Sequence, residues 1–72
     1  MAPPSCSGSD VCRELAKIGF REVSQKGSHK KLKNDGGRVV IVPMHKSLKP
    51  GTVRSICRQA GITVDELAAL LR

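Results

Sequence analysis

The hydrophobic residues near the start of the chain recur with a helical period. Val11, Leu15 and Ile18 are spaced so that they share one face of a helix. The pattern predicts a first helix that begins just after Ser7 or Ser9 and ends at Ile18.

The middle of the chain reads as three short strands. Residues 20–25 and 28–33 are separated by a turn at Gly27, and residues 34–37 (Asn-Asp-Gly-Gly) form a strong hairpin signal because they tolerate positive φ. Residues 38–42 contain four consecutive β-branched residues and are followed by a proline. This third strand is apolar on both faces, so we expect it to be well covered.

Helical periodicity returns toward the end of the chain. Pro50 is suited to the first turn of a helix and Gly61 to its end. A capping-box pattern, Thr63 with Glu66, marks the start of a short third helix, as Ser7 with Asp10 does for the first. The predicted buried residues of the second helix are Val53, Ile56, Cys57 and Ala60, and the short third helix carries Leu67, Leu70 and Leu71.

These elements predict an α+β fold of order α-β-β-β-α with a further short C-terminal helix. Hairpin connections make the three-stranded sheet antiparallel, and two amphipathic helices are expected to cover one face and leave the other open. Residues 1–7 hold two prolines and no periodicity, which predicts a disordered arm with an exposed Cys6 thiol. Residues 8–72 are predicted to form a single domain.

Composition restricts the possible functions. The net charge of +7 favours an acidic partner, nucleic acid above all. No apolar run approaches the ~20 residues of a spanning helix, and no signal-peptide core is visible, so we expect a cytoplasmic protein without membrane contact. Three cysteines with no Cys-x-x-Cys pair predict neither a disulfide framework nor a metal site. A core with one aromatic residue leaves little room for a small-molecule cofactor.

The densest positive run, residues 26–31, contains His29. If Leu32 faces the helices, strand alternation places His29, Lys31 and Lys33 together on the opposite, open face. Imidazole can both take and give a proton near neutral pH, and ammonium groups bind phosphates. A solvated surface histidine is the plain alternative.

This arrangement suits RNA cleavage through the ribose. A neutral imidazole at His29 would take the 2′-hydroxyl proton as that oxygen attacks the next phosphate, while lysines stabilise charge on the phosphoryl oxygens. Ser28 would donate a hydrogen bond to phosphate, and no carboxylate completes a serine triad. The predicted RNA-binding residues are Lys26, Ser28, Lys30, Lys31, Lys33, His45, Lys46, Lys49, Arg54 and Arg58.

Two other functions remain open from the residues alone. One is a non-catalytic RNA-binding module, which would bind RNA in a salt-dependent way without producing new ends. The other is an adaptor whose basic face binds an acidic protein.

Several segments in fixed order resemble the HicA family, the small toxins of HicA–HicB toxin–antitoxin pairs. Family members often carry an aromatic residue at the position of Leu32. The matching segments are Lys17–Phe20, Gln25–His29, Gly37–Pro43 with His45, Leu48–Thr52 and Arg54–Ile62.

The resemblance implies a fold like that of a double-stranded-RNA-binding domain. It also implies an endoribonuclease that cleaves mRNA independently of metal and halts translation, with His29 as the catalytic residue. A HicB-like antitoxin is then expected to cover the active surface.

Overall fold

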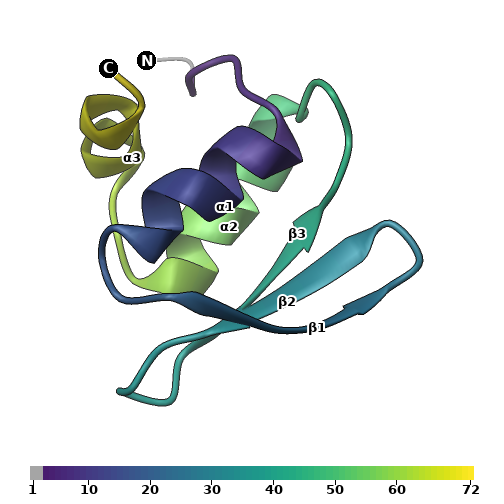
Figure 1. Cartoon of the computed structure of the whole chain (residues 1–72). Coiled ribbons are helices and arrows are strands. Elements are labelled where there is room, and N and C mark those ends of the chain that lie inside the picture. The colour runs from purple at the N-terminus through teal and green to yellow at the C-terminus, as the bar shows by residue number, and fades with distance from the viewer. Residues whose placement is uncertain (1–2) are drawn as a thin grey trace.

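The sequence pattern and the observed elements follow the same order (Figure 1). The structure, a computed structural model, describes residues 3–72. Its elements are α1 (Gly8–Ala16), β1 (Arg21–Lys26), β2 (His29–Lys33), β3 (Val39–Pro43), α2 (Pro50–Ala60) and α3 (Val64–Leu71). The predicted α+β order, with a short helix after the main motif, is therefore confirmed.

The first helix ends two residues earlier than its hydrophobic pattern predicted. Ile18 and Phe20 both donate their backbone N–H to the Leu15 carbonyl, each at 3.1 Å, so the chain leaves the α-helical register after Ala16. Gly19 then adopts φ +99°, which a residue with a side chain rarely adopts. Ile18 is consequently 40% exposed rather than part of the core.

Both predicted capping boxes are present. The Ser7 hydroxyl accepts from the Asp10 N–H at 3.0 Å, and the Asp10 carboxylate accepts from the Ser7 N–H at 3.1 Å. Thr63 and Glu66 make the same reciprocal pair at 3.0 and 2.8 Å. These bonds satisfy backbone donors that a helix start would otherwise leave without partners.

The three strands form one antiparallel sheet in the order β1-β2-β3. Leu32 lies opposite Val40, and Lys31 lies opposite Ile41. Because side chains alternate between faces, Leu32 and Val40 point toward the helices while Lys31 and Ile41 point to the other face. A bulge between Glu22 and Ser24 interrupts the β1–β2 ladder.

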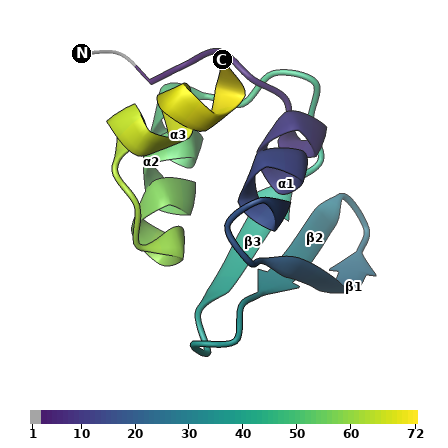
Figure 2. The same cartoon turned by 60° about the vertical axis from the view of Figure 1, so that its left-hand side comes forward.

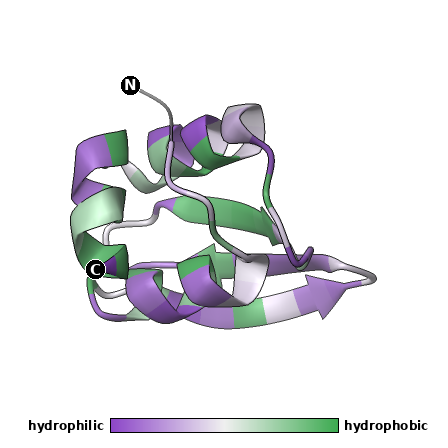
Figure 3. Cartoon of the chain, turned by 90° about the horizontal axis from the view of Figure 1, so that it is seen from above, coloured by the Kyte–Doolittle hydropathy of each residue, from purple (hydrophilic) through white to green (hydrophobic). Residues whose placement is uncertain are grey.

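α1 and α2 cover the same face of the sheet, and α3 packs against both of them (Figures 1 and 2). Hydrophobic residues run along β3, whereas β1 and β2 are mainly hydrophilic (Figure 3). Leu32 is buried, so the position where family members often carry an aromatic residue belongs to the core rather than to the surface. The largest fully buried side chains are Val11, Leu15, Val40, Val42, Val53, Ile56 and Leu67.

The segment before α1 is fastened to the loop that precedes α2. Leu48 donates its N–H to the Cys6 carbonyl, and Gly8 donates to the His45 carbonyl, both at 2.9 Å. Cys6 is only 6% exposed, so the expectation of an exposed Cys6 thiol is wrong. The disordered arm over residues 1–7 otherwise stays a prediction, and Met1 and Ala2 lie outside the described residues.

Gly8 makes an unusually close approach to the chain after β3. A methyl group at Gly8 would overlap the Pro43 carbonyl oxygen and lie 2.9 Å from the Met44 Cα. The first turn of α1 can pack this closely because residue 8 has no side chain. Within residues 3–72, no helix is long and apolar enough to cross a membrane.

Candidate functional site

His29 is exposed and begins β2 at the end of the sheet where the β1–β2 hairpin and the β3–α2 loop meet. Its neighbours across the ladder are Lys26 on β1 and Pro43 on β3. The hairpin turns at Gly27, which has φ +59°, and Met44 donates its backbone N–H to the Ser28 carbonyl. The backbone just before His29 is therefore held by a hydrogen bond from the chain after β3.

A groove of about 540 Å³ lies between the sheet at His29 and helix α2. β2 and β3 supply one wall, and α2 with the residue before it supplies the other. The residues that line the groove are His29, Ile41, Pro43, Lys49, Gly51, Thr52, Ser55, Ile56 and Gln59.

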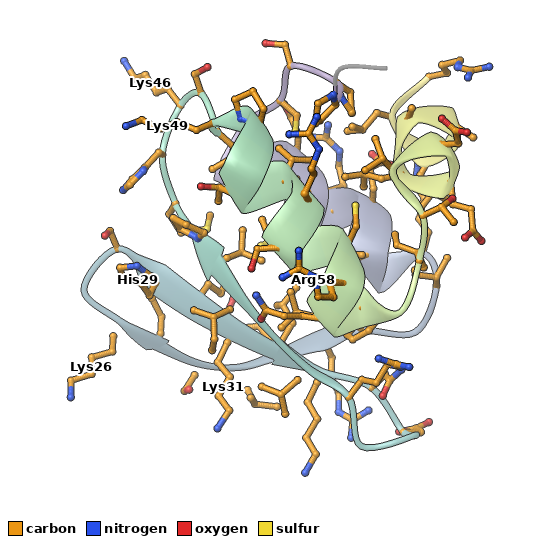
Figure 4. The ribbon with its side chains drawn as sticks, turned by 180° about the vertical axis from the view of Figure 1, so that it is seen from behind. Lys26, His29, Lys31, Lys46, Lys49 and Arg58 are labelled. Carbon is orange, nitrogen blue, oxygen red and sulfur yellow. The ribbon has the colours of Figure 1, made fainter. Side chains whose placement is uncertain are left out.

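The residues that line the groove with His29 differ from the neighbours that the sequence predicted for it. Alternation correctly places Lys31 and Lys33 on the face away from Leu32, but neither lysine lines the groove. His29 and Lys31 point in different directions from β2 (Figure 4). The face is not simply open, because α2 lies beside β3 and borders the end where His29 sits.

Gln59 fastens α2 to the outer edge of β3. Its side-chain oxygen Oε1 accepts from the Ile41 backbone N–H at 2.8 Å, and its Nε2 donates to the Ser55 hydroxyl at 3.1 Å. Arg38 adds a bond from Nη1 to the Gln59 carbonyl at 3.3 Å. These bonds fix the separation of the two groove walls.

The other predicted RNA-binding residues are distributed around the groove. Lys49 lines it, and Lys26, Ser28, His45, Lys46, Arg54 and Arg58 are exposed without lining it. Figure 4 shows Lys46 and Lys49 together at the start of α2 and Arg58 farther along that helix. Lys30 differs, because its side chain is 21% exposed and its Nζ lies 3.1 Å from Glu22 Oε1.

Ion pairs are unevenly spread over the molecule. In the described part of the chain, the five ion pairs all join residues between Asp10 and Asp35. The sequence from Gly36 to Val64 holds no aspartate or glutamate at all. The cations of this stretch, Arg38, Lys46, Lys49, Arg54 and Arg58, are exposed, and none of them takes part in an ion pair within residues 3–72.

The cysteines have a structural role. Burial raises the pKa of the Cys6, Cys12 and Cys57 thiols above the ordinary value, which keeps them protonated and poorly nucleophilic. Cys12 Sγ lies 3.9 Å from Met44 Sδ at the edge of the core. Within residues 3–72, no group of three or more His, Cys, Asp or Glu side chains gathers to hold a metal ion.

Sequence reasoning identified His29 and Lys49 but missed the remaining groove residues. Ser55 and Gln59 stand four apart on α2, which puts them on one helix face. The spacing of four residues indicates a shared helix face, but it does not reveal that this face contacts the edge of β3. Ile41 and Pro43 gave no signal beyond that of an ordinary strand.

Comparison with known proteins gives a consistent identification. A comparison with curated protein sequences finds no match. One chain of a solved structure, "Toxin-Antitoxin complex from Streptococcus pneumoniae", is 30% identical with a TM-score of 0.68, and the match covers 78% of this chain and 97% of that one. Residues 8–62 match the family model described as the HicA toxin of bacterial toxin–antitoxin systems. The chain therefore belongs to the HicA toxin family.

Proposed function

We propose that this protein is the toxin of a type II toxin–antitoxin pair and that it acts as a metal-independent endoribonuclease on mRNA. The observation that carries the proposal is the position of His29, a proton-transfer group at a groove bordered by Lys49 and surrounded by cations without paired carboxylates. Membership of the HicA toxin family supports the same function.

The proposed reaction uses the ribose as nucleophile. His29, as neutral imidazole, takes the proton of a 2′-hydroxyl while that oxygen bonds to the adjacent phosphorus. The bond from phosphorus to the 5′-oxygen breaks, leaving a 2′,3′-cyclic phosphate on one product; the departing 5′-oxygen takes a proton from water, and the His29 imidazolium returns its proton to the solvent. Lys49 and Lys26 stabilise the added negative charge on the phosphoryl oxygens.

His45 receives a different role in this proposal. It is exposed in the loop after β3 and does not line the groove. We therefore assign it to phosphate contact, together with Ser28, Lys46, Arg54 and Arg58, and we assign proton transfer to His29. Lys31 and Lys33 extend the same phosphate contacts along the sheet, and Lys30 contributes less because Glu22 already pairs with it.

An antitoxin partner is part of the proposal. The similar solved chain belongs to a toxin–antitoxin complex. A HicB-like antitoxin that covers the cations around the groove would block access of RNA to His29. Such a pair would act in the cytoplasm, where its mRNA substrate is found.

The decisive experiment compares the wild type with His29→Ala on RNA in the presence of EDTA. We expect the variant to lose about 10²- to 10⁴-fold in cleavage rate, the usual contribution of a general acid–base group. His45→Ala removes a proposed phosphate contact but no proposed proton-transfer group, so its loss should be much smaller than that of His29→Ala. Cleavage by His29→Ala at the wild-type rate would refute the assignment of His29.

A non-catalytic RNA-binding module is the second candidate, favoured by the uncompensated cations of residues 36–64. It predicts that the purified wild type binds RNA with a steep salt dependence and generates no new ends. Detection of 2′,3′-cyclic phosphate ends with EDTA-treated wild type would exclude it.

A further inference from the structure

The groove beside His29 has more apolar surface than phosphate binding requires. Its lining includes Ile41, Pro43 and Ile56, and Ile41 is 39% exposed to solvent. The volume of about 540 Å³ lies within the roughly 300–1,000 Å³ of small-molecule pockets. Phosphates are bound by cations and N–H groups, whereas the face of a base is bound by apolar surface. The lining therefore fits a nucleoside rather than a backbone.

The α2 wall carries the polar side chains of Lys49, Thr52, Ser55 and Gln59, and the last two are hydrogen-bonded to each other. Ser55 Oγ accepts a hydrogen bond from Gln59 Nε2, so its own O–H is directed to another acceptor. Within residues 3–72, no protein acceptor for that proton is found, and Ser55 lines the groove. Gln59 Oε1 is occupied by the Ile41 N–H. Ser55 therefore presents a hydrogen-bond donor to whatever occupies the groove.

Paired RNA does not offer such an occupant. In an A-form duplex the bases are stacked, the major groove is too narrow for side chains, and proteins contact mainly phosphates and 2′-hydroxyls. A base can enter a groove of this kind only when it is unpaired and turned out of the stack. Phe20, the one residue of the Phe, Tyr and Trp class, is 4% exposed in the core, so none of these rings is available in the groove.

We propose that the groove between β3 and α2 binds one unpaired nucleotide of the RNA, packed on Ile41 and Pro43 and hydrogen-bonded by the Ser55 hydroxyl. The substrate is accordingly single-stranded RNA, although the fold is like that of a double-stranded-RNA-binding domain. This inference rests on the proposed function, because it places the bound nucleotide next to the phosphate at which His29 is proposed to promote cleavage. Ser55 is then a specificity-determining residue, selecting a base with an acceptor at the contacted edge.

Binding measurements separate this inference from the cleavage itself. The cleavage-deficient His29→Ala protein is titrated with a labelled single-stranded oligoribonucleotide, with the same strand hybridised to its complement, and with the strand carrying abasic positions. We expect about tenfold tighter binding of the intact single strand than of the other two, the effect of burying roughly 55 Å² of apolar surface. Equal affinity for single strand and duplex would overturn the inference.

Variants of the groove test the contact directly. In the His29→Ala background, Ser55→Leu fills the groove and Ser55→Ala removes the donor, while Ser9→Ala on the exposed surface of α1 is the control. Ser55→Leu should lower single-strand affinity about tenfold, the effect of losing roughly 55 Å² of buried apolar surface, and leave duplex affinity unchanged. Ser55→Ala should give a smaller loss that depends on the base. Thermal unfolding by circular dichroism shows whether each variant is folded.

The remaining outcomes are distinct. Cleavage of single-stranded and duplex RNA by the wild type at the same rate would keep the proposed function and overturn the unpaired-nucleotide inference. Groove-dependent binding without cleavage would support the inference and refute the enzyme. Loss of antitoxin binding in Ser55→Leu, with RNA affinity unchanged, would show that the groove docks a protein and overturn the inference.

Discussion

The two helices that cover the sheet, α1 and α2, differ in how their charges are neutralised. On α1, Glu14 pairs with Lys17 at 2.7 Å and with Arg13 at 3.3 Å, and Arg13 also pairs with Asp10 at 3.0 Å. On α2, Arg54 and Arg58 have no acidic residue anywhere in the helix. Both helices bury an apolar face in the same core, but Glu14 on α1 is itself only 4% exposed, whereas Arg54 and Arg58 on α2 are exposed.

The N-termini of the two helices also differ in whether a side chain caps them. α1 begins with a capping box, whereas α2 begins at Pro50 after Lys49, whose side chain makes no capping bond. α1 therefore satisfies its own polar and charged groups, as a helix with a purely structural role does. α2 leaves both its cations and its first turn free to meet an anion. We therefore assign stability to α1 and recognition to α2.

The two helices should have equal roles in the core. Leu15→Ala on α1 and Ile56→Ala on α2 should each lower the free energy of unfolding by about 2–5 kcal/mol, because both side chains are essentially fully buried. Chemical denaturation measures both values. A reduction several times larger on one helix would show that the two do not share the core equally.

Substitutions on the outer face of α2 should change RNA binding, whereas matched substitutions on α1 should not. Arg54→Gln with Arg58→Gln should lower RNA affinity and reduce the salt dependence by about 0.7 in log–log slope for each phosphate that the protein no longer neutralises. Arg13→Gln with Lys17→Gln is the matched pair on α1 and should leave the slope unchanged. Titration at several salt concentrations gives both slopes. Equal changes in slope for the two double variants would show that α2 does not contribute more to RNA binding than α1 does.

Substitutions at the helix N-termini should give a smaller difference in the free energy of unfolding. Ser7→Ala and Thr63→Ala should each cost about 1 kcal/mol in unfolding free energy, the usual value of an N-cap. Lys49→Ala should cost much less, because its side chain makes no cap, yet it should weaken RNA binding. Urea denaturation measures the stability of these three variants, and RNA titration measures their affinity for RNA. A destabilisation by Lys49→Ala equal to that by Ser7→Ala would contradict it.

The smallest expected effect is the response of α1 to acid. The Ser7 N–H, followed by the Ser7 hydroxyl and Arg13, holds the pKa of Asp10 below its ordinary value. The stability from Asp10 is therefore present above the unfolded pKa of about 3.9 and is lost as the pH falls through the lower folded value. Asp10→Asn should flatten the stability profile below about pH 4, measured by thermal unfolding. An unchanged profile would show that Asp10 is not a source of the acid response.

The local features of the fold could be predicted from the sequence because short-range chemistry determines them. Ser7 with Asp10 and Thr63 with Glu66 specify helix starts within four residues, and the four β-branched residues before Pro43 specify a strand. Leu32 was expected to face the helices because it is the one apolar residue of its strand, and alternation then placed Lys31 and Lys33 on the other face. Family resemblance added the identity, which the comparisons confirm.

The groove could not be predicted, because it depends on contacts between distant segments. Gln59 reaches Ile41 across 18 residues of sequence, and nothing in either segment specifies that pairing. Cys6 was missed for the same reason, since Leu48 fixes it from another part of the chain. The roles of His29 and the RNA-binding residues remain predictions that the experiments above test.

Gly8 links a helix that carries no site residue to the wall of the groove. Its backbone lies against the Pro43 carbonyl oxygen, and Pro43 lines the groove opposite α2. Any side chain at position 8 would have to displace Pro43 or tilt the first turn of α1. A substitution at Gly8 would therefore reshape the proposed site by moving its backbone, although the chemistry of every groove side chain would be unchanged.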